Sequence, residues 1–132
     1  MIIGMGRGGT GTYKVLENRR PGEILGIEFN EDWAEKLRSD GMNVEVADAT
    51  HTDFWYKLHL STPVEELILL AMPTHMSNLF AAERIQASGL DCKVVAIAKH
   101  ETEVEELNKM GVLSFNLYLE AEEDLGREAL GV

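Results

Sequence analysis

The sequence predicts a doubly wound α/β fold: a single domain over residues 1–132 with a six-stranded parallel sheet. Short apolar runs alternate with amphipathic stretches along the whole chain, which indicates strands joined by right-handed helical crossovers. The run over residues 67–72 is almost continuously apolar, as expected of a strand that helices cover on both faces. A chain of 132 residues, 45% of them hydrophobic, is long enough to bury one core.

The first half of the chain predicts three strands and three helices. The strands are expected over residues 1–3, 23–28 and 43–47, and the helices from about 9 to 18, 31 to 39 and 53 to 60. The helix over 31–39 has clear boundaries, because Asn30 can cap its start and Gly41 follows its end. Trp33, Ala34 and Leu37 are expected on one face of this helix.

The second half repeats the same alternation. Strands are expected over residues 66–72, 93–98 and 112–116, and helices from about 74 to 88, 101 to 110 and 120 to 130. Gly89 and Gly111 stand where the first two of these helices should stop.

Composition excludes several classes of function. Lys and Arg number 12 against 23 Asp and Glu, and the resulting net charge of -11 repels nucleic acids and anionic lipid headgroups. No apolar run approaches the roughly 20 residues that cross a bilayer, so we expect no direct membrane insertion. The lone Cys92 cannot form an internal disulfide, and the four scattered histidines lack metal-ligand spacing, so no metal site is expected.

The chemistry-bearing motif lies between the first strand and the first helix. Gly4, Gly6 and Gly9 stand in the register G-x-G-x-x-G. In this context the first glycine permits a tight turn, the second lets a pyrophosphate approach the backbone, and the third lets the helix pack on the strand. The helix N-terminus then offers free N–H groups to phosphates, and Arg7 can add a charged clamp. The motif is typical of a Rossmann-like nucleotide site.

An acidic residue follows at the distance this site requires. Glu28 ends the second predicted strand, 19 residues after Gly9 (28 − 9 = 19). A carboxylate at this place accepts hydrogen bonds from ribose hydroxyls and repels a 2′-phosphate. Phe29 and Asn30 come next, so no arginine is present to neutralise that phosphate. The sequence therefore favours NAD(H) or a simple adenine nucleotide over NADP.

Two later segments are candidates for the rest of the cleft. Asp48, after the third strand, can accept a hydrogen bond from the adenine amine. The segment after the fourth strand lies beside the point where the strand order reverses, where ligands settle in such sheets. An alternative interpretation makes Asp48 and Thr74 helix caps and Pro73 a first-turn residue.

Taken together, these motifs resemble the TrkA-N type of RCK (regulator of potassium conductance) domain, and most closely the cytoplasmic NAD-binding domain of Kef-type potassium/proton antiporters. The segments that carry the resemblance are Gly4-x-Gly6-Arg7-x-Gly9, Glu28, Ala47-Asp48-Ala49-Thr50, Ala71-Met72-Pro73, Val94-Val95-Ala96-Ile97-Ala98-Lys99, Gly111-Val112 and Asn116-Leu117-Tyr118.

The resemblance implies a regulatory domain that binds NAD(H) or AMP and controls potassium/proton antiport or potassium efflux. Its implied residue roles are as follows: phosphates at Gly4, Gly6, Arg7 and Gly9, adenosine ribose at Glu28, adenine at Asp48 and Thr50, and cleft walls at Ala71 and Met72. It also implies a homodimer at the cytoplasmic face of the cell membrane, attached to a membrane-embedded cation/proton antiporter. We therefore expect this chain to be part of a longer protein or a detached subunit of one.

Two enzyme classes remain as alternatives to a binding module without catalysis. The chain is the cofactor half of an NAD-dependent dehydrogenase if a substrate domain accompanies it. It is a methyltransferase, a weaker hypothesis, if the same loop holds S-adenosylmethionine instead of a pyrophosphate-containing nucleotide.

Overall fold

A computed structural model describes residues 1–60 and 67–116 of the chain. Its strands are β1 (Ile2–Ile3), β2 (Gly26–Glu28), β3 (Val44–Val46), β4 (Leu67–Leu70), β5 (Lys93–Ala98) and β6 (Leu113–Asn116). Its helices are α1 (Arg7–Arg19), α2 (Glu31–Ser39), α3 (Thr52–Leu60), α4 (His75–Ser88) and α5 (Glu101–Lys109). The helix predicted over 120–130 lies outside the described residues.

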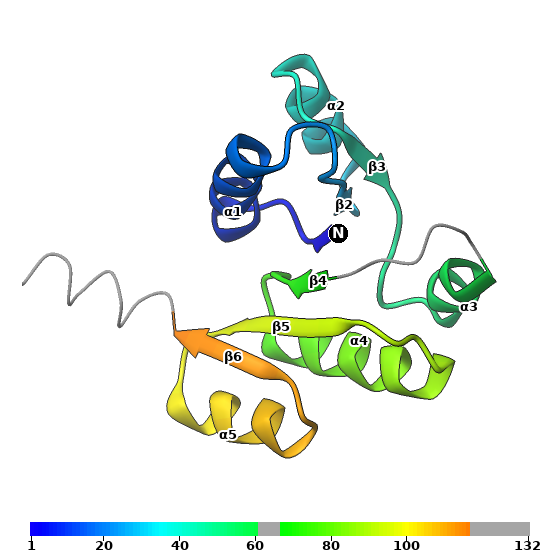
Figure 1. The fold of residues 1–132 in the computed structure, drawn as a ribbon, viewed down its shortest axis with the longest axis vertical. Helices are drawn as coiled ribbons and strands as arrows, with labels where there is room; N and C mark the ends of the chain where they lie inside the picture. Colours follow the sequence, from blue (N-terminus) through cyan, green and yellow to red (C-terminus); the bar gives the residue numbers. More distant parts are fainter. Residues whose placement is uncertain (61–66, 117–132) are drawn as a thin grey trace, which may run out of the picture.

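The six strands of the described chain are all parallel and form one sheet in the order β3-β2-β1-β4-β5-β6. Helices α1 and α2 accompany the β1–β3 half, whereas α4 and α5 accompany the β4–β6 half (Figure 1). The order reverses between β1 and β4, so the connections that follow these two strands leave in opposite directions. The predicted doubly wound, Rossmann-like single domain is thereby confirmed.

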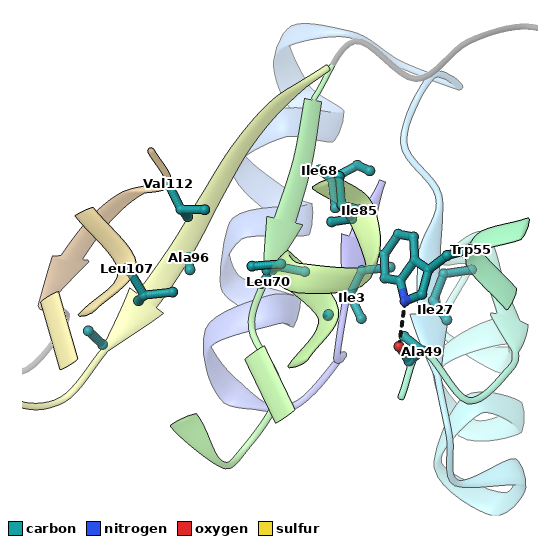
Figure 2. Packing of buried hydrophobic residues seen from close by; sticks show 13 residues of the cluster. Ile3, Ile27, Ala49, Trp55, Ile68, Leu70, Ile85, Ala96, Leu107 and Val112 are labelled. Carbon is teal, nitrogen blue, oxygen red and sulfur yellow. Dashed lines mark hydrogen bonds between the residues drawn. The ribbon is translucent and has the colours of Figure 1, made fainter. Parts of the chain in front are cut away.

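The short central strand β1 shows how the sheet is covered on both faces. Ile2 packs in a buried cluster with Leu37 of α2, on the face that α1 and α2 cover. Ile3, the next residue, points to the opposite face and packs in a cluster with Ile85 of α4 and Leu107 of α5 (Figure 2). Consecutive side chains of a strand alternate between faces, so two residues suffice to join both halves of the core.

Strand β4 confirms the prediction made from its apolar run. Ile68, Leu69 and Leu70 are all buried, the first and third in one cluster and the second in the other. On the α4 face, the buried indole of Trp55 donates from Nε1 to the carbonyl oxygen of Ala49 at 2.7 Å (Figure 2). This bond ties α3 to the loop that follows β3.

The predicted element boundaries are confirmed for α2 and β5 and need correction elsewhere. Helix α1 begins at Arg7 rather than near Gly9, because Gly6 already forms its N-cap. Strand β2 begins at Gly26 rather than at residue 23. Gly26 is the first residue of β2 in register with both neighbours, with Ile2 of β1 and with Val44 of β3.

The predicted caps explain where three helices start or stop. The Asn30 side chain accepts a hydrogen bond from the backbone N–H of Trp33 at 2.9 Å, and α2 begins at the next residue. Thr74 caps α4, which therefore begins one residue later than predicted. Gly89 and Gly111 both have φ of +77°, the left-handed conformation that ends α4 and follows α5. Within the described ranges, no helix has the length and apolarity needed to cross a membrane.

Candidate functional site

A cleft of about 590 Å³ opens where β1, β2, β3 and β4 end. The loops that follow these strands line it, together with Trp33 from the first turn of α2 and Ser77 from the first turn of α4. This volume is typical of small-molecule sites, and its place at the reversal of strand order is the usual place for a ligand in such sheets. The site therefore lies where the sequence motifs converge.

The glycines of the first loop are required by close backbone contacts. Gly4 has φ of +94°, and a Cβ placed there would lie 2.7 Å from the carbonyl oxygen of Ala71. A Cβ at Gly9 would lie 1.9 Å from the carbonyl oxygen of Gly4. The predicted tight turn at Gly4 and the close helix–strand packing at Gly9 are both present.

The start of α1 is open toward the cleft. Gly6 lines the cleft, and a Cβ there would meet no atom within 4 Å. No side chain caps this helix and its first turn holds no acidic residue, whereas α2 has both the Asn30 cap and two acidic residues. Arg7 is exposed at the first helical position. The N-terminus of α1 thus keeps its partial positive charge for an anionic ligand.

Met5, the residue between the first two glycines, anchors the loop. Its side chain is fully buried, and a Cβ at Gly26 would come within 2.6 Å of its sulfur. Its backbone N–H donates to Glu28 Oε1 at 3.1 Å, and its carbonyl oxygen accepts from Trp33 Nε1 at 2.7 Å. Both sides of the loop backbone are therefore fastened, one to the end of β2 and the other to α2.

Sequence reasoning missed this anchoring by Met5 and Trp33. Trp33 was expected on the core face of α2 with Ala34 and Leu37, but only the latter two are buried. The Trp33 side chain is 38% exposed and lines the cleft, because its indole reaches over the first loop to the Met5 carbonyl. The sequence feature that could have indicated this contact is a tryptophan in the first turn of the helix that follows Glu28.

Glu28 lies at the end of β2 and lines the cleft, as its spacing from the glycine loop predicts. Its Oε2 accepts from the Asn30 N–H at 2.8 Å, in addition to the bond from Met5 to Oε1. Since a carboxylate offers about four lone-pair positions, each oxygen keeps capacity for one ligand hydroxyl. Glu28 can therefore hold the loop and a vicinal diol at the same time.

Asp48 and Thr50 form a closed turn at the cleft wall. Asp48 Oδ1 accepts from the Thr50 hydroxyl at 2.6 Å and from the Thr50 N–H at 2.9 Å. These two bonds, the side-chain bond first, hold the pKa of Asp48 below its ordinary value of 3.8. The alternative of Asp48 as a helix cap is wrong, because α3 begins only at Thr52.

The loop after β4 forms the remaining wall. Met72, Pro73 and Thr74 line the cleft, whereas Ala71 is buried behind it and donates from its N–H to the Ile3 carbonyl at 2.8 Å. Thr74 is the N-cap of α4, which confirms its interpretation as a cap. Pro73 precedes the cap and is not a first-turn residue, since the helix starts only after Thr74.

Of the nine predicted site residues, six line the cleft: Gly4, Gly6, Glu28, Asp48, Thr50 and Met72. Gly9 and Ala71 lie directly behind it and shape it through their contacts with Gly4. Arg7 stands exposed at the start of α1. Among the residues that the structure describes, no group of three His, Cys, Asp or Glu side chains could hold a metal ion.

Known proteins match this chain in two respects, a sequence family and the fold. Residues 1–115 match the family model of the TrkA-N domain. The fold is similar to that of the NAD(P)-binding domain of an exopolyphosphatase-related protein from Archaeoglobus fulgidus, with a TM-score of 0.82 at 17% sequence identity over 99% of this chain and 97% of that one. It is also similar to the TrkA-N domain of the inner membrane protein ybaL from Escherichia coli, with a TM-score of 0.73 at 19% identity over 98% and 92% of the two chains. A search of the curated proteins found no match.

Proposed function

The chain belongs to the TrkA-N domain family, and on that premise we propose that its cleft binds NAD(H) as a regulatory ligand. The resemblance predicted from the motifs is confirmed over residues 1–115. The observation that carries the proposal is the pairing of an uncapped α1 N-terminus at Gly6 with the Glu28 carboxylate across one cleft. A phosphate and a ribose diol are the groups that these two features would bind.

The proposed ligand lies across the loops in the order that the geometry suggests. The pyrophosphate sits at Gly6 and the first turn of α1, where Arg7 can approach it. The adenosine ribose donates to Glu28, and the adenine lies toward Asp48 and Thr50. The other half of the dinucleotide extends toward Met72. The NAD(P)-binding domain from Archaeoglobus fulgidus, which has the same fold, supports a ligand of this class.

Charge supports NAD(H) over phosphate-rich nucleotides. Two carboxylates, Glu28 and Asp48, line the adenosine end of the cleft, and they repel a 2′-phosphate or a triphosphate placed near them. AMP would use only the adenosine half of the cleft. We propose it as a competitor of NAD(H) rather than as an equal ligand.

We further propose that the domain regulates transport and is not an enzyme. In this proposal a homodimer of the chain sits at the cytoplasmic face of a membrane and controls a potassium/proton antiporter. The TrkA-N domain of ybaL, an inner membrane protein, supports a membrane-linked setting. Nucleotide binding would bias the transporter by about 1–3 kcal/mol, the usual size of an allosteric coupling.

Thermal unfolding with a nucleotide panel tests the ligand. NAD, NADH, NADPH, AMP, ATP and S-adenosylmethionine are compared on the wild-type chain, on Glu28→Gln and on Glu105→Gln. A ligand at a hundredfold excess over its Kd should stabilise the wild type by about 2.7 kcal/mol. Glu28→Gln replaces an ionic acceptor by a neutral amide and should weaken NADH binding about tenfold. Glu105 is exposed on α5, so its variant should respond like the wild type.

Three outcomes would contradict parts of this proposal. No stabilisation by any nucleotide would make the glycine loop purely structural. Equal loss of NADH binding in both variants would mean that the loss does not come from the Glu28 contact with the ligand. Hydride transfer from NADH to a small substrate by the chain would favour the dehydrogenase interpretation. Sedimentation velocity with and without NADH tests the dimer.

A further inference from the structure

Asn78 is a buried polar side chain that the ligand site does not use directly. It lies near the start of α4 and is only 2% exposed. Among the residues that the structure describes, it is the only polar or charged residue that is buried. Burying an amide costs free energy unless each of its groups finds a hydrogen-bond partner. Its partners therefore indicate why an apolar residue does not occupy this place.

The Asn78 amide pairs with the backbone of Met72 in two directions. Its Oδ1 accepts from the Met72 N–H at 3.0 Å, and its Nδ2 donates to the Met72 carbonyl oxygen at 3.2 Å. Both peptide groups of Met72 are thereby fixed from within the protein. Met72 itself lines the cleft and also packs against the core cluster that contains Ile3 and Ile85.

One of the two peptides that Asn78 fixes is also the one against which the glycine loop rests. A Cβ at Gly4 would lie 2.7 Å from the Ala71 carbonyl oxygen and 2.8 Å from the Met72 nitrogen. The Ala71–Met72 peptide therefore packs directly on the Gly4 backbone. A rotation of this peptide would push on the first loop, whose other side is fastened through Met5.

We propose that Asn78 is a positioning residue for nucleotide binding: through Oδ1 it holds the Ala71–Met72 peptide that packs on the Gly4 turn, and through Nδ2 it holds the Met72–Pro73 peptide in the cleft wall. This proposal rests on the proposed function, since it assigns how the NAD(H) cleft is kept in shape. Asn78 does not contact the ligand and acts through Met72 and Gly4. Its loss should weaken nucleotide affinity in a chain that is still folded.

The test compares three variants with NADH as the probe. Asn78→Asp keeps the shape but, when ionised, turns an acceptor toward the Met72 carbonyl in place of the donor. Asn78→Ala removes both hydrogen bonds without adding charge. Asn108→Asp makes the same charge change at an exposed site on α5 and serves as the matched control. Calorimetry measures the affinity of each chain between about pH 5.5 and pH 8, below the unfolding temperature of the least stable variant.

We expect Asn78→Asp at pH 8 and Asn78→Ala at every pH to bind NADH about tenfold more weakly than the wild type, because at least one of the two bonds that hold the Met72 backbone is lost. At about pH 5.5 the buried carboxyl that Asn78→Asp introduces should be protonated. Its O–H can then donate to the Met72 carbonyl as the amide does, so the affinity of Asn78→Asp should approach the wild-type value measured at the same pH. Asn108→Asp should follow the wild type throughout.

Other results would overturn the proposal. If Asn78→Ala binds as the wild type does while Asn78→Asp is weak at pH 8, the effect is charge repulsion and not positioning. If Asn78→Ala does not fold, Asn78→Asp alone provides the test. The proposal is then wrong if Asn78→Asp still binds NADH more weakly than the wild type at about pH 5.5.

A measurement without ligand separates this inference from the proposed function. Amide hydrogen exchange at Met72 and Gly4 should be faster in Asn78→Ala than in the wild type, whether or not a nucleotide binds. Unchanged exchange would refute the positioning role even in a chain that binds NADH. If exchange is faster in Asn78→Ala but the wild-type chain binds no nucleotide, Asn78 does position the Met72 backbone and the proposed ligand is wrong.

Discussion

Two side chains that line the cleft, those of Glu28 and Trp33, also hold the backbone of neighbouring loops in place. Glu28 accepts hydrogen bonds from the backbone of Met5 and Asn30, and Trp33 donates to the Met5 carbonyl. A carboxylate that binds a ligand and also fixes the loop beside it links affinity to local order. Substitution of Glu28 therefore tests two effects at once. Glu28→Gln keeps one oxygen that can accept one of the two loop hydrogen bonds, whereas Glu28→Ala removes both, so Glu28→Gln disturbs the loop less.

The Asp48–Thr50 turn makes a prediction about acid sensitivity. Because the pKa of Asp48 is lowered in the folded chain, its stabilisation is complete above the ordinary value of 3.8 and is lost as the pH falls through the lower folded value. Thr50→Val removes the side-chain hydrogen bond, which is the largest cause of the shift. The pKa of Asp48 should then rise toward 3.8 in a carbon-detected NMR titration.

Thr102→Val, at an exposed position of α5, is the control for this titration and should leave the pKa of Asp48 where it is in the wild type. An unchanged Asp48 pKa in Thr50→Val would assign the shift to the backbone N–H alone.

At the level of elements, the turns and caps were readable because they depend on local chemistry. Asn30 and Thr74 cap their helices as expected, and Gly89 adopts the positive φ that ends α4. Strand ends were less predictable, because a ladder extends only as far as its neighbour does. Strand β2 begins only at Gly26, where its pairing with both β1 and β3 begins, and residues 23–25 themselves carry no signal for this boundary.

Two glycines of α1 give a matched pair of variants. A Cβ at Gly9 would lie 1.9 Å from the Gly4 carbonyl oxygen, whereas a Cβ at Gly11 would meet nothing within 4 Å. Gly9→Ala should therefore destabilise the chain by about 3 kcal/mol through forced separation of α1 from the loop. Gly11→Ala should stabilise it by about 0.5–1 kcal/mol, because alanine favours helix. Denaturant unfolding measures both, and equal effects of the two variants would contradict the contact at Gly9.

At the scale of the whole molecule, the dominant electrostatic property is the net charge of -11. Its self-repulsion opposes the compact state and is screened by salt. The unfolding temperature should therefore rise by about 3 °C when monovalent salt increases from low to about 0.3 M, a free-energy change below about 1 kcal/mol. Scanning calorimetry measures this rise.

Glu105→Lys lowers the magnitude of the charge by two and should show a smaller dependence on salt. A decrease in unfolding temperature with salt would mean that ion pairs contribute more to stability than the repulsion costs.

The sequence by itself determined the fold class, the glycine loop, the acidic strand end and the helix caps Asn30 and Thr74, because each depends on residues close together in the chain. Six of the nine residues that it predicted for the site line the cleft, since parallel strands end at one edge of the sheet. Only the tertiary structure decided what holds that cleft in shape. The Met5–Trp33 and Asn78–Met72 hydrogen bonds depend on how a helix packs over a loop, and hydrophobic spacing does not encode the direction of an indole N–H or of a side-chain amide.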